Sequence, residues 1–205
     1  MPKPIIALDA DGVLLDYHVA YRNAWLKAFN HLPAPKDSNA YWPVDRWDVR
    51  KLDGDELAHF RGFFDEEFWR TIPAVDGAIL ACNQMHAAGF ELVCVSAIES
   101  RFENARLENL RNLGFPIHRV IATSSSHDGI SPKAAALSLL NPIAFVDDYL
   151  PYHRGVPESI HRALITRETN GTPNIGAELG NIDTYHQDLL AFSKWWLENF
   201  PKLSS

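Results

Sequence analysis

The sequence predicts an α/β protein in which a parallel β-sheet is covered by helices on both faces. Five short apolar runs lie along the chain, and segments of helical periodicity separate most of them. The runs do not alternate between apolar and polar residues, which is typical of strands buried on both faces. This order of strands and helices favours parallel pairing. The five runs are residues 5–8, 91–95, 119–123, 142–146 and 162–166.

Helices of the core are predicted between these strands and after the last one. Two segments have apolar residues at helical spacing and stop at glycines, Gly89 and Gly114, which commonly follow the end of a helix. A third begins with Pro132, a residue suited to a first helical turn. The predicted helices are residues 76–88, 99–113, 132–140 and 185–199.

The regular order is interrupted after the first strand, because residues 17–75 contain no run typical of a buried strand. Helical stretches are predicted near 18–31 and 54–69, and the segment between them is rich in proline and aromatic residues. That segment is too aromatic to be typical of a disordered linker. We therefore expect a helical subdomain over 17–75, inserted into a core domain formed by 1–16 and 76–205.

Length, charge and composition limit the class of function. The chain has 205 residues, of which 46% are hydrophobic, so one domain with a modest insertion is expected. The net charge of −7 argues against binding of a nucleic-acid polymer, which usually requires a basic face. The two cysteines, Cys82 and Cys94, indicate neither a disulfide framework nor a zinc site. No signal peptide or membrane span is predicted, so we expect cytoplasmic residence; the oligomeric state stays open.

Polar side chains follow three of the predicted strands at their carboxyl ends. Asp9 and Asp11 follow the first strand, Ser96 follows the second, and Asp147 and Asp148 follow the fourth. Each feature alone is common in turns and loops. Because ligands of open parallel sheets bind at the carboxyl ends of the strands, the joint placement predicts one functional site.

The residue types in this set suit phosphoryl transfer. Clustered carboxylates repel one another unless a cation lies among them, and Mg²⁺ prefers carboxylate and phosphate oxygens. Asp9 could supply a nucleophilic oxygen, since aspartyl phosphate is a known type of covalent intermediate. Ser96 can donate a hydrogen bond to a phosphoryl oxygen. Lys133, at the start of a predicted helix, adds positive charge where negative charge gathers during transfer.

These residues resemble the four motifs of the haloacid dehalogenase superfamily of phosphohydrolases. LDADGVLLD (8–16) is similar to the first motif, VSAIES (95–100) to the second, SPK (131–133) to the third, and AFVDD (144–148) to the fourth. The resemblance spans nearly the whole core, and it implies that this core is Rossmann-like. It also places residues 17–75 where that family inserts a helical C1-type cap.

The resemblance implies a role for the residues of the first three motifs. Asp9 attacks phosphorus and binds Mg²⁺ through its other oxygen. Asp11 protonates the leaving group and then activates water, and its backbone carbonyl reaches the metal. Ser96 and Lys133 hold the phosphoryl group, and Lys133 also steadies Asp9.

The fourth motif completes the implied metal site, with Asp147 as a ligand of Mg²⁺ and Asp148 as a direct or indirect partner. Which of the two is the direct ligand stays open. The implied function is a Mg²⁺-dependent phosphatase that hydrolyses a small phosphorylated metabolite, of nucleotide monophosphate or sugar phosphate type, through an aspartyl-phosphate intermediate.

Several other functions remain open on the sequence alone. Phosphomutases with such a cap have a similar first motif. A dehalogenase is disfavoured, because those relatives lack the second acid and Asp11 is present here. A phospho-accepting receiver domain would place its acceptor on a middle strand, where this chain has Ser96. A regulatory binding protein could keep the fold without turnover.

Two further segments could contact substrate. The inserted segment carries Trp42, Arg46 and Trp47, a mixture suited to a base, a ring or a second anionic group, although the tryptophans could instead pack the cap core. We expect the cap to be a mobile lid with hinges near 16–18 and 73–77. The sequence SSSHDG (124–129) is interpreted as a polar loop.

Overall fold

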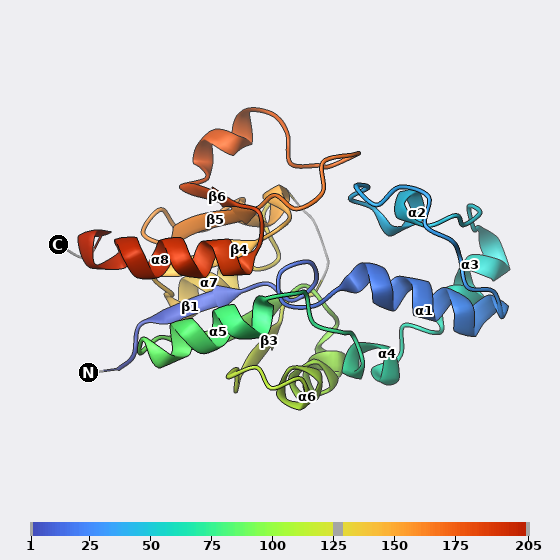
Figure 1. Ribbon diagram of the computed structural model, residues 1–205, viewed down its shortest axis with the longest axis horizontal. Helices are drawn as coiled ribbons and strands as arrows, with labels where there is room; N and C mark the ends of the chain where they lie inside the picture. Colours follow the sequence, from blue (N-terminus) through green and yellow to red (C-terminus); the bar gives the residue numbers. More distant parts are fainter. Residues whose placement is uncertain (1, 125–128, 204–205) are drawn as a thin grey trace.

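The structure is a parallel sheet with helices on both faces and a helical insertion beyond the carboxyl ends of the strands (Figure 1). The computed structural model describes residues 2–124 and 129–203. In this part of the chain, six strands pair in the order β3-β2-β1-β4-β5-β6, all in parallel. The predicted α/β, Rossmann-like fold class is therefore confirmed. The strands are β1 (Ile5–Leu8), β2 (Glu91–Ser96), β3 (Val120–Ala122), β4 (Ala144–Asp147), β5 (His161–Ile165) and β6 (Thr184–His186).

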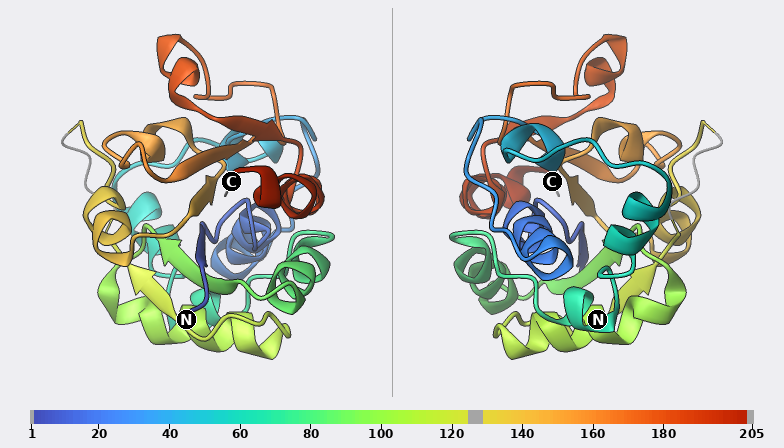
Figure 2. Two further views of the ribbon diagram at one scale, coloured as in Figure 1. Left: turned by 90° about the vertical axis from the view of Figure 1, so that its left-hand side faces the viewer. Right: turned by 90° about the vertical axis from the view of Figure 1, so that its right-hand side faces the viewer.

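Helices bury both faces of the sheet, which explains why the strands read as continuous apolar runs (Figure 2). On β1, Ile6 and Leu8 belong to the apolar cluster of one face, and Ala7 belongs to that of the other. Among the described residues, three helices of the core pack on the first face and one packs on the second. These are α5 (Ala78–Ala87), α6 (Glu103–Asn112) and α8 (Leu189–Leu203) on the first face, and α7 (Ala134–Leu140) on the second.

The insertion is helical, as predicted, and has an aromatic interior. Phe60 lies 5.1 Å from Tyr21 and 5.3 Å from Trp25, measured between ring centroids. These rings belong to the same apolar cluster as the α5–α8 face, so the insertion and the core share one continuous interior. Its helices are α1 (Tyr17–Phe29), α2 (Pro43–Arg46), α3 (Gly54–Arg61) and α4 (Glu66–Arg70).

The predicted helices differ in their bounds from those in the structure, and three of the differences have a clear form. The helix expected over 54–69 is divided into α3 and α4, because the Asp65 carboxylate accepts a hydrogen bond from the Phe68 amide at 2.9 Å and caps a new helix. The helix expected over 132–140 begins two residues late, at Ala134. The helix expected over 185–199 begins at Leu189, because the residues before it form the short edge strand β6.

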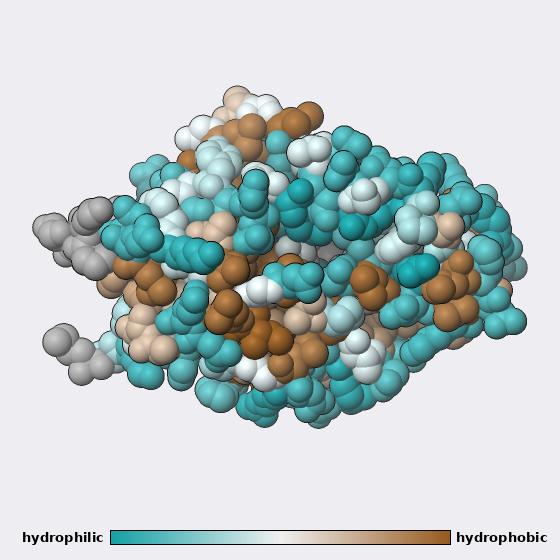
Figure 3. Space-filling model, in the orientation of Figure 1, coloured by the Kyte–Doolittle hydropathy of each residue, from teal (hydrophilic) through white to brown (hydrophobic). Residues whose placement is uncertain are grey.

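The surface is mixed in polarity. Figure 3 shows apolar residues interspersed with hydrophilic ones on the face of the molecule where α5 and α8 lie. Within the described ranges, no helix combines the length and the apolar character that crossing a membrane requires. Cytoplasmic residence stays a prediction.

The end of the insertion is fastened to the core helix α6. The buried side-chain amide of Asn109 donates to the backbone carbonyls of Arg70 and Ile72, at 2.8 and 3.0 Å. At the surface, Arg70 also pairs with Glu108, with 2.6 Å between Nε and Oε2. Helix α4 therefore packs as part of the core, although the sequence places it in the insertion.

A second contact joins the insertion to the loop after β5. The Tyr41 amide donates to the carbonyl of Asn170 at 2.9 Å, and the Asn170 amide donates to the carbonyl of Asn39 at 3.0 Å. The Asn170 side chain also donates to Asp37 at 2.9 Å. The insertion thus reaches the core on both sides of the carboxyl edge of the sheet.

Replacing Asn109 should weaken the junction between α4 and α6. Asn109→Ala leaves two buried carbonyls without their donor, so we expect a loss of about 1–3 kcal/mol in the free energy of unfolding. For a chain of this length, the melting temperature should fall by about 2–4 °C for each kcal/mol lost. Asn112→Ala, at an exposed position of the same helix, is the control and should change stability little. Equal melting temperatures for both variants would contradict this account.

Candidate active site

The sheet order brings the polar strand ends together. In the sheet, β1 lies between β2 and β4, with Leu8 paired to Cys94 on one side and to Val146 on the other. The next amide, that of Asp9, donates to the carbonyl of Val146 at 2.9 Å. The residues that follow these three strand positions therefore meet at one edge, as predicted from the sequence.

A buried ammonium group joins two of the carboxylates. Lys133, the residue before α7, is completely buried, and its Nζ contacts Asp9 Oδ1 and, at 2.6 Å, Asp147 Oδ2. Burial by itself would lower the pKa of Lys133, but Asp147 and Asp9 more than offset this and raise the pKa above its usual range. The other oxygen of Asp147 accepts a hydrogen bond from the Tyr149 amide at 2.9 Å. Lys133 is therefore a permanent cation within the site.

Asp148, the residue after Asp147, pairs with a different cation. Arg167 donates to Asp148 Oδ2 from Nε at 3.1 Å and from Nη2 at 2.9 Å. Burial raises the pKa of Asp148, and Arg167 opposes that rise. Sequence reasoning did not select Arg167, although it follows the predicted strand 162–166, and the rule applied to the other strand ends would have found it.

The acids at this edge form a cluster suited to a cation. Asp9, Asp147 and Asp148 are buried and offer oxygens that all lie within 4.8 Å of one another. Three carboxylates face two side-chain cations, Lys133 and Arg167, so one negative charge remains uncompensated. Oxygen ligands and excess negative charge are what a hard divalent cation requires. The donor set therefore fits a metal ion.

Asp11 lies apart from this cluster and pairs with a different arginine. Arg106, on α6, is completely buried and donates from Nη2 to Asp11 Oδ2 at 2.8 Å. Burial raises the pKa of Asp11, and Arg106 acts against that rise. Nothing in the local sequence distinguishes Arg106 from other helical arginines, so it was not predicted.

The predicted phosphate-binding serine has an uncommitted hydroxyl. Ser96 is buried at the end of β2, and its Oγ has no hydrogen-bond partner within the described structure. A buried hydroxyl without a partner is costly unless a ligand supplies one. Ser96 ends the strand that pairs with β1, and the residue after it, Ala97, lines the cavity that contains Asp9.

Gly12 allows the loop after β1 to pass close to Asp148. Its φ is +91°, a conformation that favours glycine. A Cβ at this position would lie 2.6 Å from Arg167 Nη2 and 2.7 Å from Asp148 Cγ. A side chain here would therefore displace the pair that Arg167 and Asp148 form.

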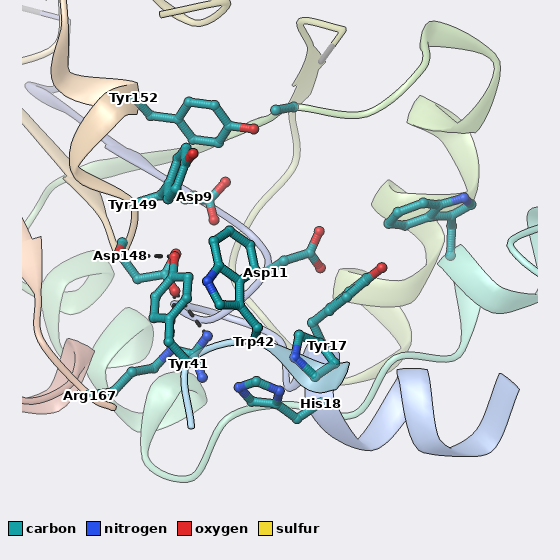
Figure 4. A pocket seen from close by; sticks show the side chains of 13 residues that line it. Asp9, Asp11, Tyr17, His18, Tyr41, Trp42, Asp148, Tyr149, Tyr152 and Arg167 are labelled. Carbon is teal, nitrogen blue, oxygen red and sulfur yellow. Dashed lines mark hydrogen bonds and ion pairs between the residues drawn. The ribbon is translucent and has the colours of Figure 1, made fainter. Parts of the chain in front are cut away.

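A cavity of about 330 Å³ opens at this edge of the sheet, between the core and the insertion (Figure 4). Both Asp9 and Asp11 line it, and most of the other lining side chains are aromatic. Of the residues predicted at the strand ends and at Lys133, Asp9, Asp11 and Asp148 line it, whereas Ser96, Lys133 and Asp147 do not. The lining residues are Asp9, Asp11, Tyr17, His18, Tyr41, Trp42, Pro43, Trp69, Ala97, Asp148, Tyr149, Tyr152 and Arg167.

Of the three cap residues predicted to contact substrate, only Trp42 lines this cavity. Arg46 is engaged elsewhere, because it pairs with Glu168 at 3.3 Å and donates to the carbonyl of Ser38. Trp47 is buried and donates from Nε1 to the carbonyl of His18 at 2.9 Å, so it supports the cavity wall from behind. The packing interpretation therefore describes Trp47 better than substrate contact does. Most of the loop 124–129 lies outside the described residues.

Comparison with solved structures identifies the fold. A haloacid dehalogenase-like hydrolase from Streptococcus pneumoniae superimposes with a TM-score of 0.61, over 95% of this chain and 98% of that protein, at 17% sequence identity. The chain has the fold of the haloacid dehalogenase proteins. No family model matches the sequence, and a search of curated proteins found no match.

Other solved structures with the haloacid dehalogenase fold differ in chemistry. One, from Clostridium acetobutylicum, is described as a predicted phosphatase; its TM-score is 0.60 at 16% identity, over 97% of this chain and all of that one. Another is the L-2-haloacid dehalogenase of Xanthobacter autotrophicus, with chloropropionic acid covalently bound; its TM-score is 0.56 at 14% identity, over 97% and 99% of the two chains. The fold alone therefore does not choose between these reactions.

Substitution of Gly12 should separate backbone strain from crowding at the site. Gly114 has a similar φ of +87° with open space where a methyl group would lie, whereas Gly12 has Asp148 and Arg167 there. We expect Gly114→Ala to cost about 1–2 kcal/mol of unfolding free energy from strain alone. Gly12→Ala should cost clearly more in the same denaturant titration. Equal costs would show that the site tolerates the methyl group.

Removing the Lys133 ammonium should leave two buried carboxylates without their cation. We expect Lys133→Met to lose about 3–5 kcal/mol of unfolding free energy at neutral pH. Mg²⁺ should restore part of that loss by supplying positive charge to the same acids, which thermal unfolding with and without the ion would measure. Lys27→Met, at an exposed position of α1, is the control. If Mg²⁺ stabilised neither variant, that would count against a metal site at these acids.

Proposed function

We propose that the protein is a Mg²⁺-dependent phosphatase that hydrolyses a small phosphomonoester through an aspartyl-phosphate intermediate. The observation that carries this proposal is the pair of acids in one cavity with different cations: Asp9 contacts Lys133, and Asp11 contacts Arg106. Two carboxylates in distinct surroundings are suited to two distinct roles, one as nucleophile and one as proton carrier.

In the first step, Asp9 attacks phosphorus. Lys133 holds Asp9 Oδ1, which leaves Oδ2 to attack the substrate. The bond between phosphorus and the ester oxygen breaks, and Asp11 gives its proton to the departing oxygen. Ser96 donates its free hydroxyl to a phosphoryl oxygen. The positive charge of Lys133 stabilises the negative charge that gathers on the phosphoryl group.

In the second step, Asp11 takes a proton from water, and the water oxygen attacks the phosphorus of the aspartyl phosphate. Inorganic phosphate leaves, and the Asp9 carboxylate is restored. Asp9, Asp147, Asp148 and the backbone carbonyl of Asp11 would hold Mg²⁺. When bound, the ion supplies positive charge that stabilises phosphoryl oxygens.

The insertion acts in this proposal as a lid that excludes water during the attack and opens to release product. We keep the proposed first hinge near residues 16–18. The second is better placed at 62–65, between α3 and α4, than at 73–77, because Asn109 fastens the chain around Arg70 and Ile72 to the core. Opening would then break the hydrogen bonds of Asn170 to the insertion.

Phosphate release from a panel of small phosphomonoesters tests the proposal. We expect turnover with Mg²⁺, loss of turnover in excess chelator, and recovery when Mg²⁺ is restored. Asp9→Asn should abolish turnover, because an amide oxygen is a poor nucleophile. Full activity in chelator would reject the metal requirement. Halide release from 2-chloropropionate without any phosphatase activity would establish the dehalogenase alternative, and transfer of phosphate between two positions of one substrate would establish the mutase.

The role of Asp11 is tested by the leaving group. Asp11→Asn should lower the rate on an alkyl phosphate by about 10²–10⁴, the usual contribution of a general acid–base group. The loss should be much smaller on an aryl phosphate, whose leaving oxygen needs little protonation. Rates on both substrates should be compared in the wild type and the variant. Equal losses on the two would assign Asp11 a role other than proton transfer to the leaving group.

A further inference from the structure

His18 is a buried polar side chain that the proposed mechanism does not use. It lies in the first turn of α1, is only 3% exposed, and lines the cavity that contains Asp9 and Asp11. Neither ring nitrogen has a hydrogen-bond partner in the described structure. The backbone carbonyl of His18 accepts a hydrogen bond from Trp47, which fixes the position of the residue.

The His18 ring is neutral in this setting. The nearest acid is Glu168, with 3.8 Å between Nε2 and Oε1, and Glu168 is itself paired with Arg167 and Arg46. The pKa of His18 is lowered to about 3, mainly by burial and to a smaller extent by the charges of Arg167 and Arg46. A neutral imidazole offers one hydrogen-bond donor and one acceptor.

Aromatic rings form most of the remaining wall (Figure 4). Tyr17 and Trp42 line the same cavity as His18, and Tyr41 packs against Trp42 with 5.0 Å between ring centroids. Tyr149 continues this wall toward Asp9. Walls of this kind suit a flat group, because stacked rings gain from both burial and ring geometry. The volume, about 330 Å³, is at the small end of the range for pockets that hold small molecules.

The charges in the cavity argue against a second anionic group on the substrate. Among the described side chains that line it, Arg167 is the one permanent cation, and it is already paired with Asp148 and Glu168. A nucleobase presents a flat face that stacks on such rings, whereas the ring of a sugar phosphate is puckered. The lining is thus matched to a group that is flat, uncharged and polar at its edge.

We propose that His18 is a specificity-determining residue that hydrogen-bonds the edge of a flat, uncharged ring in the leaving group, and that the substrate class is nucleoside monophosphates. This inference rests on the proposed phosphatase function and narrows it. The phosphoryl group lies at Asp9, and the base lies among the aromatic rings with its polar edge at His18. Because an unpaired buried donor or acceptor is costly, His18 favours the binding of substrates that supply a hydrogen-bond partner for its ring.

Kinetics on matched substrates test the role of His18. Uridine and adenosine 5′-monophosphates carry a base, and glycerol 3-phosphate has a short leaving group that lacks one. With His18→Phe, we expect kcat/KM to fall about 10- to 100-fold on the nucleotides, the effect of lost hydrogen bonds to a buried group, and far less on glycerol 3-phosphate. His18→Asn, which keeps a donor and an acceptor, should lose less. His59→Phe, at an exposed position of the insertion, is the control and should match the wild type.

Binding of the free nucleosides decides the same question without turnover. Uridine and adenosine should bind the wild type in calorimetry, and His18→Phe should weaken that binding by a similar factor. If no phosphomonoester is hydrolysed but nucleosides bind in this way, the phosphatase proposal fails and the assignment of His18 stands. The assignment is overturned if the wild type binds no nucleoside, or if His18→Phe binds it as tightly. Equal losses on nucleotides and glycerol 3-phosphate would also overturn it, because His18 would then only support the fold.

Discussion

The site is organised around the ammonium group of Lys133. It contacts Asp9, which follows β1, and Asp147, at the end of the neighbouring strand β4. Two buried carboxylates this close would repel strongly without a cation between them. The ammonium group also lies over an aromatic ring, with 4.6 Å between Nζ and the centroid of the Tyr152 ring. The approach of the two strand ends, and with it the floor of the cavity, depends on this buried contact.

The other two acids have separate cations from separate parts of the chain. Arg106 on α6 pairs with Asp11, and Arg167 after β5 pairs with Asp148. Each arginine opposes the rise in pKa that burial causes in its acid. Four carboxylates can therefore stay close together while differing in their surroundings. That difference supports distinct chemical roles for Asp9 and Asp11, whereas the fold is shared by dehalogenases and phosphatases alike.

The insertion completes the cavity because it is attached to the core on two sides. Asn109 holds the chain after α4 against α6, and Asn170 holds the segment before α2 against the loop after β5. The cavity walls contributed by α1 and by Trp42 lie between these two attachments. One attachment uses a buried side chain and the other lies at the surface. The second is therefore the easier one to break if the insertion moves.

Much of the fold and the centre of the site could be predicted from the sequence. Buried parallel strands are continuous apolar runs, and Asp9, Ser96 and Asp147 stand where such runs end. Both signals are local, so they can be read without knowing what the chain packs against. The edge strand β6 escaped prediction because it is only three residues long and is not fully buried.

Only the tertiary structure decided how these acids are paired and which residues of the insertion face them. Arg106 and His18 lie on helices with no local mark of function, and each becomes notable because packing buries it beside the cavity. The sequence suggests Arg46 as a substrate contact, but in the structure Arg46 forms an ion pair with Glu168. The physical reason is that the effect of a charged or polar group depends on its solvent exposure and its partners. Both are set by segments distant in the sequence, which local patterns do not encode.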